Sequence, residues 1–260
     1  PSNDRDFLGL PIRTLSQNPS KSFQWSQELR YARDFGENLS YVLGAFWFNQ
    51  VTKTLGREEQ GAAAWRWLAN PTAANEILGL AGALDGYGQR VQIRSDHTSA
   101  AVFGQMEWHV TDKLRILPGL RFNADEKSGF YRATPYGQLN TTGLGFTNAQ
   151  ITALRNLELS ILQPLSYETE GEDDNVSYNL TVAYEVANNA NAYATYSTAF
   201  KTFGLNNNGI PVDSNNQPIL SLASIKPEDT KHIEAGLKAE PFPGVTANFT
   251  AYQTTIDDYQ

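Results

Sequence analysis

Two kinds of side chain alternate along the segment Val176-Ser177-Tyr178-Asn179-Leu180-Thr181-Val182-Ala183-Tyr184-Glu185-Val186. One face of this extended segment carries valine, tyrosine and leucine, and the other carries mostly polar side chains. A period of two predicts a β-strand that lies between two different environments. When such strands repeat along a chain, the pattern is typical of a transmembrane β-barrel, which meets lipid outside and a polar interior inside.

The composition excludes several classes of protein. The 260 residues carry a formal net charge of -8, and 12% of them are aromatic. No cluster of lysine and arginine stands out, so the chain is not expected to bind nucleic acid. The lack of cysteine excludes disulfides, thiolate metal sites and cysteine nucleophiles. The mean hydropathy is -0.43, and no apolar run approaches the roughly 20 residues of a membrane-spanning helix.

The alternating pattern predicts four hairpins with short turns, separated by long polar connections. They cover 22–51 with a turn at 34–38, 97–125 with a turn at 111–113, 175–203 with a turn at 188–191, and 229–259 with a turn at 241–244. Strands of about 12–14 residues exceed the roughly 9–11 that cross a bilayer at a tilt. Pro118 cannot donate to a ladder, so we expect a bulge or distortion there. Short turns on the periplasmic side and long loops outside are the rule in outer-membrane barrels.

Three long connections join the hairpins. The connection at 52–94 predicts helices at Glu58–Leu68 and Ala73–Leu84. The connection at 127–173 predicts a helix at Asn148–Leu162 and ends in an acidic run at 168–174, whose spacing does not match a calcium-binding EF-hand loop. We interpret that run as a solvated loop end. The third connection, 204–226, is rich in glycine and asparagine.

Charged residues in the polar phase of the strands are candidates for the barrel interior, because a charge facing lipid at mid-depth costs about 2–4 kcal/mol. These lumen-facing candidates are Glu28, Arg30, Arg121, Asn179, Glu185, Lys201, Glu234 and Lys238. They could bind substrate or a plug, although cross-strand polar pairs that hold the wall together are the simpler interpretation. Lipid contacts and interfacial girdles, rather than a sugar platform, are predicted for Trp25, Tyr31, Trp47, Trp108, Phe122, Tyr178, Tyr184, Tyr193 and Phe249.

The sequence contains no pattern that predicts catalysis, a cofactor or a metal. His97, His109 and His232 lie far apart and lack the paired spacing of metal ligands. The serine and histidine residues are not in a nucleophile-elbow context. We therefore predict that the chain is not an enzyme.

Several strand segments resemble those of the TonB-dependent outer-membrane receptors. Pro227-Glu228 followed by Glu234-Ala235-Gly236-Leu237-Lys238 is similar to a Pro-Glu…Glu-x-Gly-x-Lys stretch of that family. Tyr193-Ala194-Thr195-Tyr196-Ser197, continuing to Phe200-Lys201, resembles its Tyr-x-x-Tyr-Ser-x-x-Phe-Lys strand end, although Thr198-Ala199 departs from the more usual basic residue and Gly. Further similar segments are Ser26-Gln27-Glu28-Leu29-Arg30, Phe103-Gly104-Gln105 and Gly119-Leu120-Arg121-Phe122.

The resemblance implies a barrel of about 22 strands in the bacterial outer membrane, plugged by an N-terminal domain. It also implies energised import of a scarce nutrient such as a ferric siderophore. The implied partners are outer-membrane lipid, the receptor's own plug domain, TonB through that plug, and a small-molecule ligand such as a metal chelate.

The expected fold is therefore all-β: an antiparallel meander of about eight strands from a larger transmembrane β-barrel. Residues 1–260 are then a partial barrel domain, without the plug domain and the C-terminal strands. The strand count leads to the same expectation. The first of the eight predicted strands is entered from the side of the long loops, and the last points toward that side, so both chain ends lie there. The alternative is a soluble extracellular carbohydrate-binding module, in which one face of each strand meets a core and the other meets water. Long loops on one side only favour the barrel.

Overall fold

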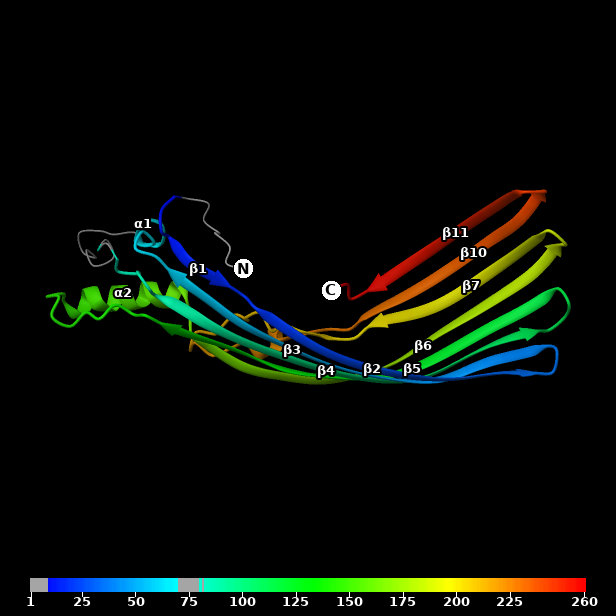
Figure 1. Ribbon diagram of the computed structural model, residues 1–260, viewed down its shortest axis with the longest axis horizontal. Helices are drawn as coiled ribbons and strands as arrows, with labels where there is room; N and C mark the ends of the chain where they lie inside the picture. Colours follow the sequence, from blue (N-terminus) through cyan, green and yellow to red (C-terminus); the bar gives the residue numbers. More distant parts are fainter. Residues whose placement is uncertain (1–8, 70–79, 81) are drawn as a thin grey trace.

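The computed structural model describes residues 9–69, 80 and 82–260. Its main element is a nine-stranded antiparallel sheet that forms a curved wall (Figure 1). The strands of the sheet are β1 (Arg13–Gln17), β2 (Ser20–Phe35), β3 (Leu39–Gln60), β4 (Gly88–His109), β5 (Leu114–Tyr136), β6 (Leu165–Ala187), β7 (Ala190–Lys201), β10 (Glu228–Phe242) and β11 (Val245–Asp257). β1 and β2 pair with successive parts of the same edge of β3. They therefore share one place in the sheet, and the nine strands form a sheet that is eight strands wide. The predicted antiparallel meander is confirmed.

The two ends of the wall differ in their connections (Figure 1). All four predicted short turns lie at one end. The helices α1 (Trp65–Leu68) and α2 (Asn148–Ile161) lie at the other end, with the long loops. The connection after β7 adds β8 (Gly204–Leu205), a 3-10 turn η2 (Leu220–Leu222) and β9 (Ser224–Ile225). In the described part of the chain, no helix is long and apolar enough to cross a membrane.

The strands extend further toward the long loops than predicted, since β3 to β6 are 22 or 23 residues long. The helix predicted at Glu58–Leu68 is therefore wrong except for its last turn. Residues 73–79 and 81 of the second predicted helix lie outside the described residues, and 82–86 form turns. The third predicted helix is confirmed as α2, which begins with a capping box between Thr147 and Gln150.

The predicted distortion at Pro118 is confirmed. Gln105 pairs with Gly119 and Trp108 pairs with Ile116, but the ladder between β4 and β5 has no pairs in between. The register is the same on both sides of this gap, so the proline interrupts the pairing without inserting a bulge.

The registers assign every side chain to one of two faces, because directly paired residues point to the same side. One row across the wall joins Leu29, Ala45, Val102, Phe122 and Val176, and we call its side the apolar face. Leu29 is 75% exposed and Val102 is 58% exposed. The opposite side is the polar face. The apolar face is therefore uncovered within the described chain, which a soluble sandwich would not tolerate.

Two predictions are wrong, one about the acidic run and one about an aromatic side chain. The acidic run at 168–174 does not end a loop but lies within β6, with Glu168 and Glu170 on the same side as Val176. Tyr193 was expected to contact lipid but lies on the polar face, because Ala192 and Ala194 take the apolar positions of β7. The other predicted lipid-contacting aromatic residues lie on the apolar face.

The long loops share a small core of their own at the end of the wall. Tyr87 and Leu84 pack there against Leu154 of α2, and all three are at most 1% exposed. The Tyr87 hydroxyl lies 2.9 Å from the Glu158 carbonyl oxygen and 3.1 Å from that of Leu162, and it donates to these acceptors. It thereby gives the Leu162 carbonyl, at the C-terminal end of α2, a partner that the helix does not supply, and it adds a second donor to the Glu158 carbonyl, which already accepts from the Leu162 amide.

This loop core is expected to weaken at high pH. Burial, and secondarily the Glu158 carboxylate, raise the pKa of Tyr87 to about 12. A raised pKa favours the neutral form in the folded loops, so the stabilisation is complete below the ordinary value of about 10 and is lost as the pH rises toward 12. Two pKa units correspond to about 2–3 kcal/mol. Hydrogen exchange in α2 and limited proteolysis of the loops between pH 9 and about 12 measure this loss. Tyr87→Phe should reduce the pH dependence of hydrogen exchange in α2, and an unchanged dependence in that variant would contradict the assignment.

Candidate functional site: the polar face and the loop folded onto it

The structure places all eight lumen-facing candidates on the polar face. It gathers most of them into two separate groups. Glu28, Arg30 and Arg121 form one group on β2 and β5, while Glu234 and Lys238 form another on β10. Asn179, Glu185 and Lys201 lie elsewhere on this face.

The first group is built around the ring of Phe103. This ring lies over the backbone of Gly44, where any side chain would overlap it. The guanidinium carbons of Arg30 and Arg121 lie 6.0 Å and 5.5 Å from the centre of the ring. Arg30 also forms an ion pair with Glu28. Two cations therefore flank one aromatic ring, an arrangement favoured by the electrostatic attraction of a cation to the ring face.

The second group is built around Tyr193. Its hydroxyl donates to Glu234 Oε1 at 2.5 Å, and Lys238 Nζ lies 5.3 Å from the centre of its ring. His232 Nε2 lies 3.5 Å from the other oxygen of Glu234. The contacts of Tyr193 with Glu234 and Lys238 join β7 to β10, whereas His232 and Glu234 lie on the same strand.

A third polar group was not anticipated from the sequence. His97 Nε2 and Asp125 Oδ1 are 2.8 Å apart, and Asp125 faces Asp173 on the next strand. Asn123, only 4% exposed, and Asp173 each have a buried polar atom that lacks a partner among the described residues. The sequence does not indicate this group, because its residues lie on three different strands and only the register of the sheet brings them together. Within the described chain no three His, Asp or Glu side chains are arranged to hold a metal ion.

The connection after β7 is packed onto the polar face near the long-loop end of the wall. The Tyr167 hydroxyl donates to the Asn206 carbonyl at 2.7 Å and accepts from the Gly209 amide at 3.1 Å. Lys127 Nζ donates to the Phe203 carbonyl at 2.5 Å. Phe203 lies over Gly171, where a side chain would clash with its ring. This connection, residues 202–226, therefore occupies space on the polar side of β5 and β6.

Removing the Tyr167 hydroxyl should loosen this connection. Tyr167→Phe leaves the Asn206 carbonyl and the Gly209 amide without that partner, at a cost of about 1–3 kcal/mol. Faster hydrogen exchange at 204–210 is the expected result. Tyr131→Phe is the matched control, because Tyr131 stacks on Tyr167 with ring centres 5.4 Å apart and keeps that contact without its hydroxyl. Equal exchange rates in the two variants would contradict the bridging role.

A curved sheet with an uncovered apolar face, a polar opposite face, short turns at one end and long loops at the other defines a wall of an outer-membrane β-barrel. The profile of the family "TonB dependent receptor-like, beta-barrel" matches residues 2–260, and the chain belongs to this family. Proteins of this family are transporters of the bacterial outer membrane and not enzymes. The predicted family, fold class and location are confirmed.

Solved structures that share the fold include two bacterial receptors. The ferric yersiniabactin uptake receptor FyuA from Yersinia pestis superposes with a TM-score of 0.65 at 18% identity, over 95% of this chain and 30% of that chain. The siderophore receptor PiuA from Acinetobacter baumannii superposes with a TM-score of 0.53 at 16% identity, over 92% of this chain and 32% of that chain. The chain thus spans about a third of the length of these receptors. No curated protein matches it by sequence.

Proposed function

We propose that residues 1–260 form part of the barrel wall and the extracellular loops of an active-transport receptor that imports a scarce nutrient. The observation that carries this proposal is the separation of an apolar and a polar face across eight strand positions. A soluble carbohydrate-binding module would need a second layer over Leu29 and Val102, which are more than half exposed. In the proposed receptor these side chains contact outer-membrane lipid.

In this proposal the polar face borders the lumen, and the lumen-facing candidates contact the ligand or a plug domain. Energy would reach the receptor from TonB through that plug. The cations Arg30 and Arg121, held against Phe103, suit an anionic metal chelate. Because FyuA is named as a ferric yersiniabactin uptake receptor and PiuA as a siderophore receptor, a ferric siderophore is the first ligand to test.

The test compares two arginine variants of the intact receptor. Arg30→Gln combined with Arg121→Gln removes both cations from the polar face, and Arg33→Gln removes one from the apolar face of the same strand as Arg30. Because a hydrogen bond to a charged group contributes about 1.5–3 kcal/mol, binding of the ferric siderophore is expected to weaken at least tenfold in the double variant only. Radiolabelled iron uptake by cells and binding by purified receptor measure this.

Insertion into the membrane is checked separately in each variant by heat-modifiable gel mobility. A properly inserted double variant with unchanged iron binding and uptake would contradict a ligand role for these arginines. A fully water-soluble, monomeric receptor would contradict the barrel assignment itself.

A further inference from the structure

The connection after β7 contains the one Asn-Gly pair of the sequence, Asn208-Gly209. The Asn208 side chain is exposed, and it forms no hydrogen bond within the described part of the chain. Gly209 has a φ of 90°, and it carries no side chain that would shield its backbone nitrogen. An asparagine amide next to such an unshielded nitrogen is open to deamidation.

Deamidation of this pair is an intramolecular reaction, which gains from the proximity of its two groups. The Gly209 nitrogen gives up its proton and attacks Cγ of Asn208. A carbon–nitrogen bond forms, and the side-chain amide leaves with a proton as ammonia. The five-membered imide then takes up water at either of its two carbonyl carbons, which yields aspartate or isoaspartate at position 208. The sum is the exchange of ammonia for water, and no other co-reactant is needed.

Tyr167 holds the attacking nitrogen away from this reaction. The Gly209 amide donates to the Tyr167 hydroxyl at 3.1 Å, and that hydroxyl donates in turn to the Asn206 carbonyl at 2.7 Å. The amide proton is thus engaged, and the nitrogen is fixed on the side of Tyr167. Attack on Asn208 therefore requires this hydrogen bond to break first.

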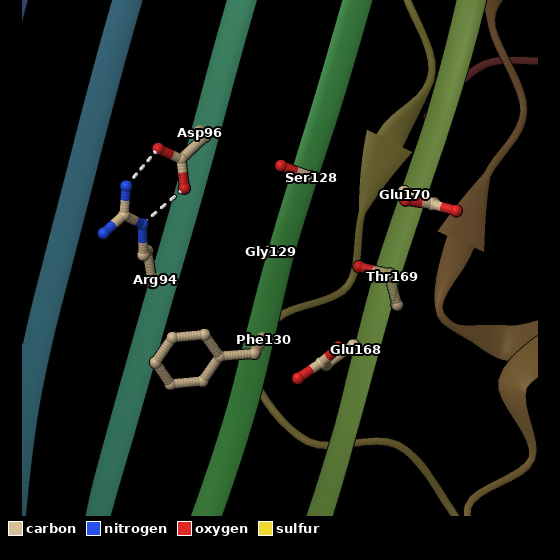
Figure 2. Close-up of a pocket in the computed structure, with 8 residues that line it drawn as sticks. All are labelled: Arg94, Asp96, Ser128, Gly129, Phe130, Glu168, Thr169 and Glu170. Carbon is tan, nitrogen blue, oxygen red and sulfur yellow. Dashed lines mark hydrogen bonds and ion pairs between the residues drawn. The ribbon is translucent and has the colours of Figure 1, made fainter.

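The residues on both sides of the pair are anchored as well. Ile210 is 5% exposed and belongs to a small core with Tyr167. Asn207 lies over Gly129, where an added Cβ would be 2.7 Å from its Nδ2, and its Oδ1 accepts from Thr169 Oγ1 at 3.5 Å. Gly129 and Thr169 stand opposite each other on β5 and β6 (Figure 2). The backbone between these anchors therefore reaches the geometry of the imide only when the connection opens locally.

Deamidation would add a carboxylate where the connection faces another acidic side chain. A cavity of about 380 Å³ is lined by Asn208 from the connection and by Glu58 and Tyr131 from the wall. Glu58 lies 3.3 Å from Arg13 in an ion pair. A second carboxylate across the cavity repels Glu58, so the product of the reaction opposes the docking of the connection.

We propose that Asn208-Gly209 is a site of spontaneous deamidation, that the Tyr167 hydroxyl restrains the reaction, and that the acidic product weakens the docking of residues 202–226 on the polar face. The change is irreversible without repair, because ammonia is lost. The inference goes beyond the proposed function, since it depends on how the connection is held and not on what the receptor carries.

The first experiment measures the rate of deamidation in the intact, detergent-purified receptor. The receptor is incubated under mildly alkaline conditions, and the modified fraction at position 208 is followed by peptide mass spectrometry. Tyr167→Phe is expected to react about five- to tenfold faster than the unaltered receptor, which is the effect of one lost hydrogen bond on local opening. Tyr131→Phe is the matched control, because it leaves the Tyr167 hydroxyl in place. Equal rates in the two variants overturn the protective role.

A synthetic peptide of residues 204–212 gives the rate of the pair without any protection. The unaltered receptor is expected to react at least tenfold more slowly than this peptide, since the Gly209 amide is free only in the open connection. This comparison does not depend on the folding of a variant. A receptor that reacts as fast as the peptide overturns the inference.

The effect of the product on docking is tested with two substitutions at the same position. Asn208→Asp carries the charge of the product, whereas Asn208→Gln stays neutral and would have to close a larger ring to react. Hydrogen exchange at 204–210 is expected to be several-fold faster in Asn208→Asp than in Asn208→Gln. Equal exchange in these two variants overturns the effect of the product on docking.

Discussion

Val182→Arg is expected to destabilise the folded wall by about 2–4 kcal/mol, the cost of a cationic side chain at the midplane of a bilayer. Val182 lies in the middle of the apolar segment of β6, between Ile116 on β5 and Ala194 on β7. These neighbours offer no carboxylate on the apolar face. An arginine there would have to be desolvated in hydrocarbon or would have to deform the surrounding lipid.

The matched control is Thr181→Arg, which places the same side chain one residue away on the polar face. Thr181 loses a hydroxyl contact to Thr195 at 2.8 Å, but a cation there lies near the carboxylate of Glu234, opposite Thr195. The folded fraction in isolated outer membranes and the urea midpoint in detergent are the measurements. We expect a large loss for Val182→Arg and a small one for Thr181→Arg. Equal losses would mean that the apolar face is not in contact with lipid.

The sequence predicted the part of the fold in which the two environments differ most. Between Val176 and Val186 one face meets hydrocarbon and the other meets polar surroundings, so the period of two is visible in the residue types. Beyond the bilayer both faces can be polar, and the signal disappears although the strand continues. This is why β3 extends to Gln60 and β6 begins at Leu165, well outside the predicted strands.

For the polar face, the sequence predicted which individual side chains lie there but not which of them contact one another. The phase of each strand placed Glu28, Arg121 and Lys238 on that face, but it could not show which of them meet. The pair His97 and Asp125 depends on the register between β4 and β5, and the contact of Tyr167 with residues 206–209 depends on how a loop folds back. Such contacts join residues 28 or more positions apart, and no local pattern encodes them.

Gly44→Ala is expected to destabilise the wall by about 1–3 kcal/mol, the usual cost of forcing extra volume into a packed site. A methyl group at this position would overlap the ring of Phe103. The guanidinium carbons of Arg30 and Arg121 lie 6.0 Å and 5.5 Å from the centre of this ring, so a displaced ring would have to move against them. The ordinary expectation is the reverse, since alanine is favoured over glycine within a strand by about 0.5–1 kcal/mol.

The neighbouring strand provides a matched control for this substitution. A methyl group at Gly104 would lie 3.0 Å from Leu43 Cδ2, the end of a flexible side chain that can move aside, so Gly104→Ala should be neutral or slightly stabilising. Removing the ring should rescue the first variant: in a Phe103→Ala background, Gly44→Ala is expected to cost little. Urea midpoints of the four proteins of this double-mutant cycle give the coupling energy. A coupling energy near zero would show that the packing of the Phe103 ring does not require glycine at position 44.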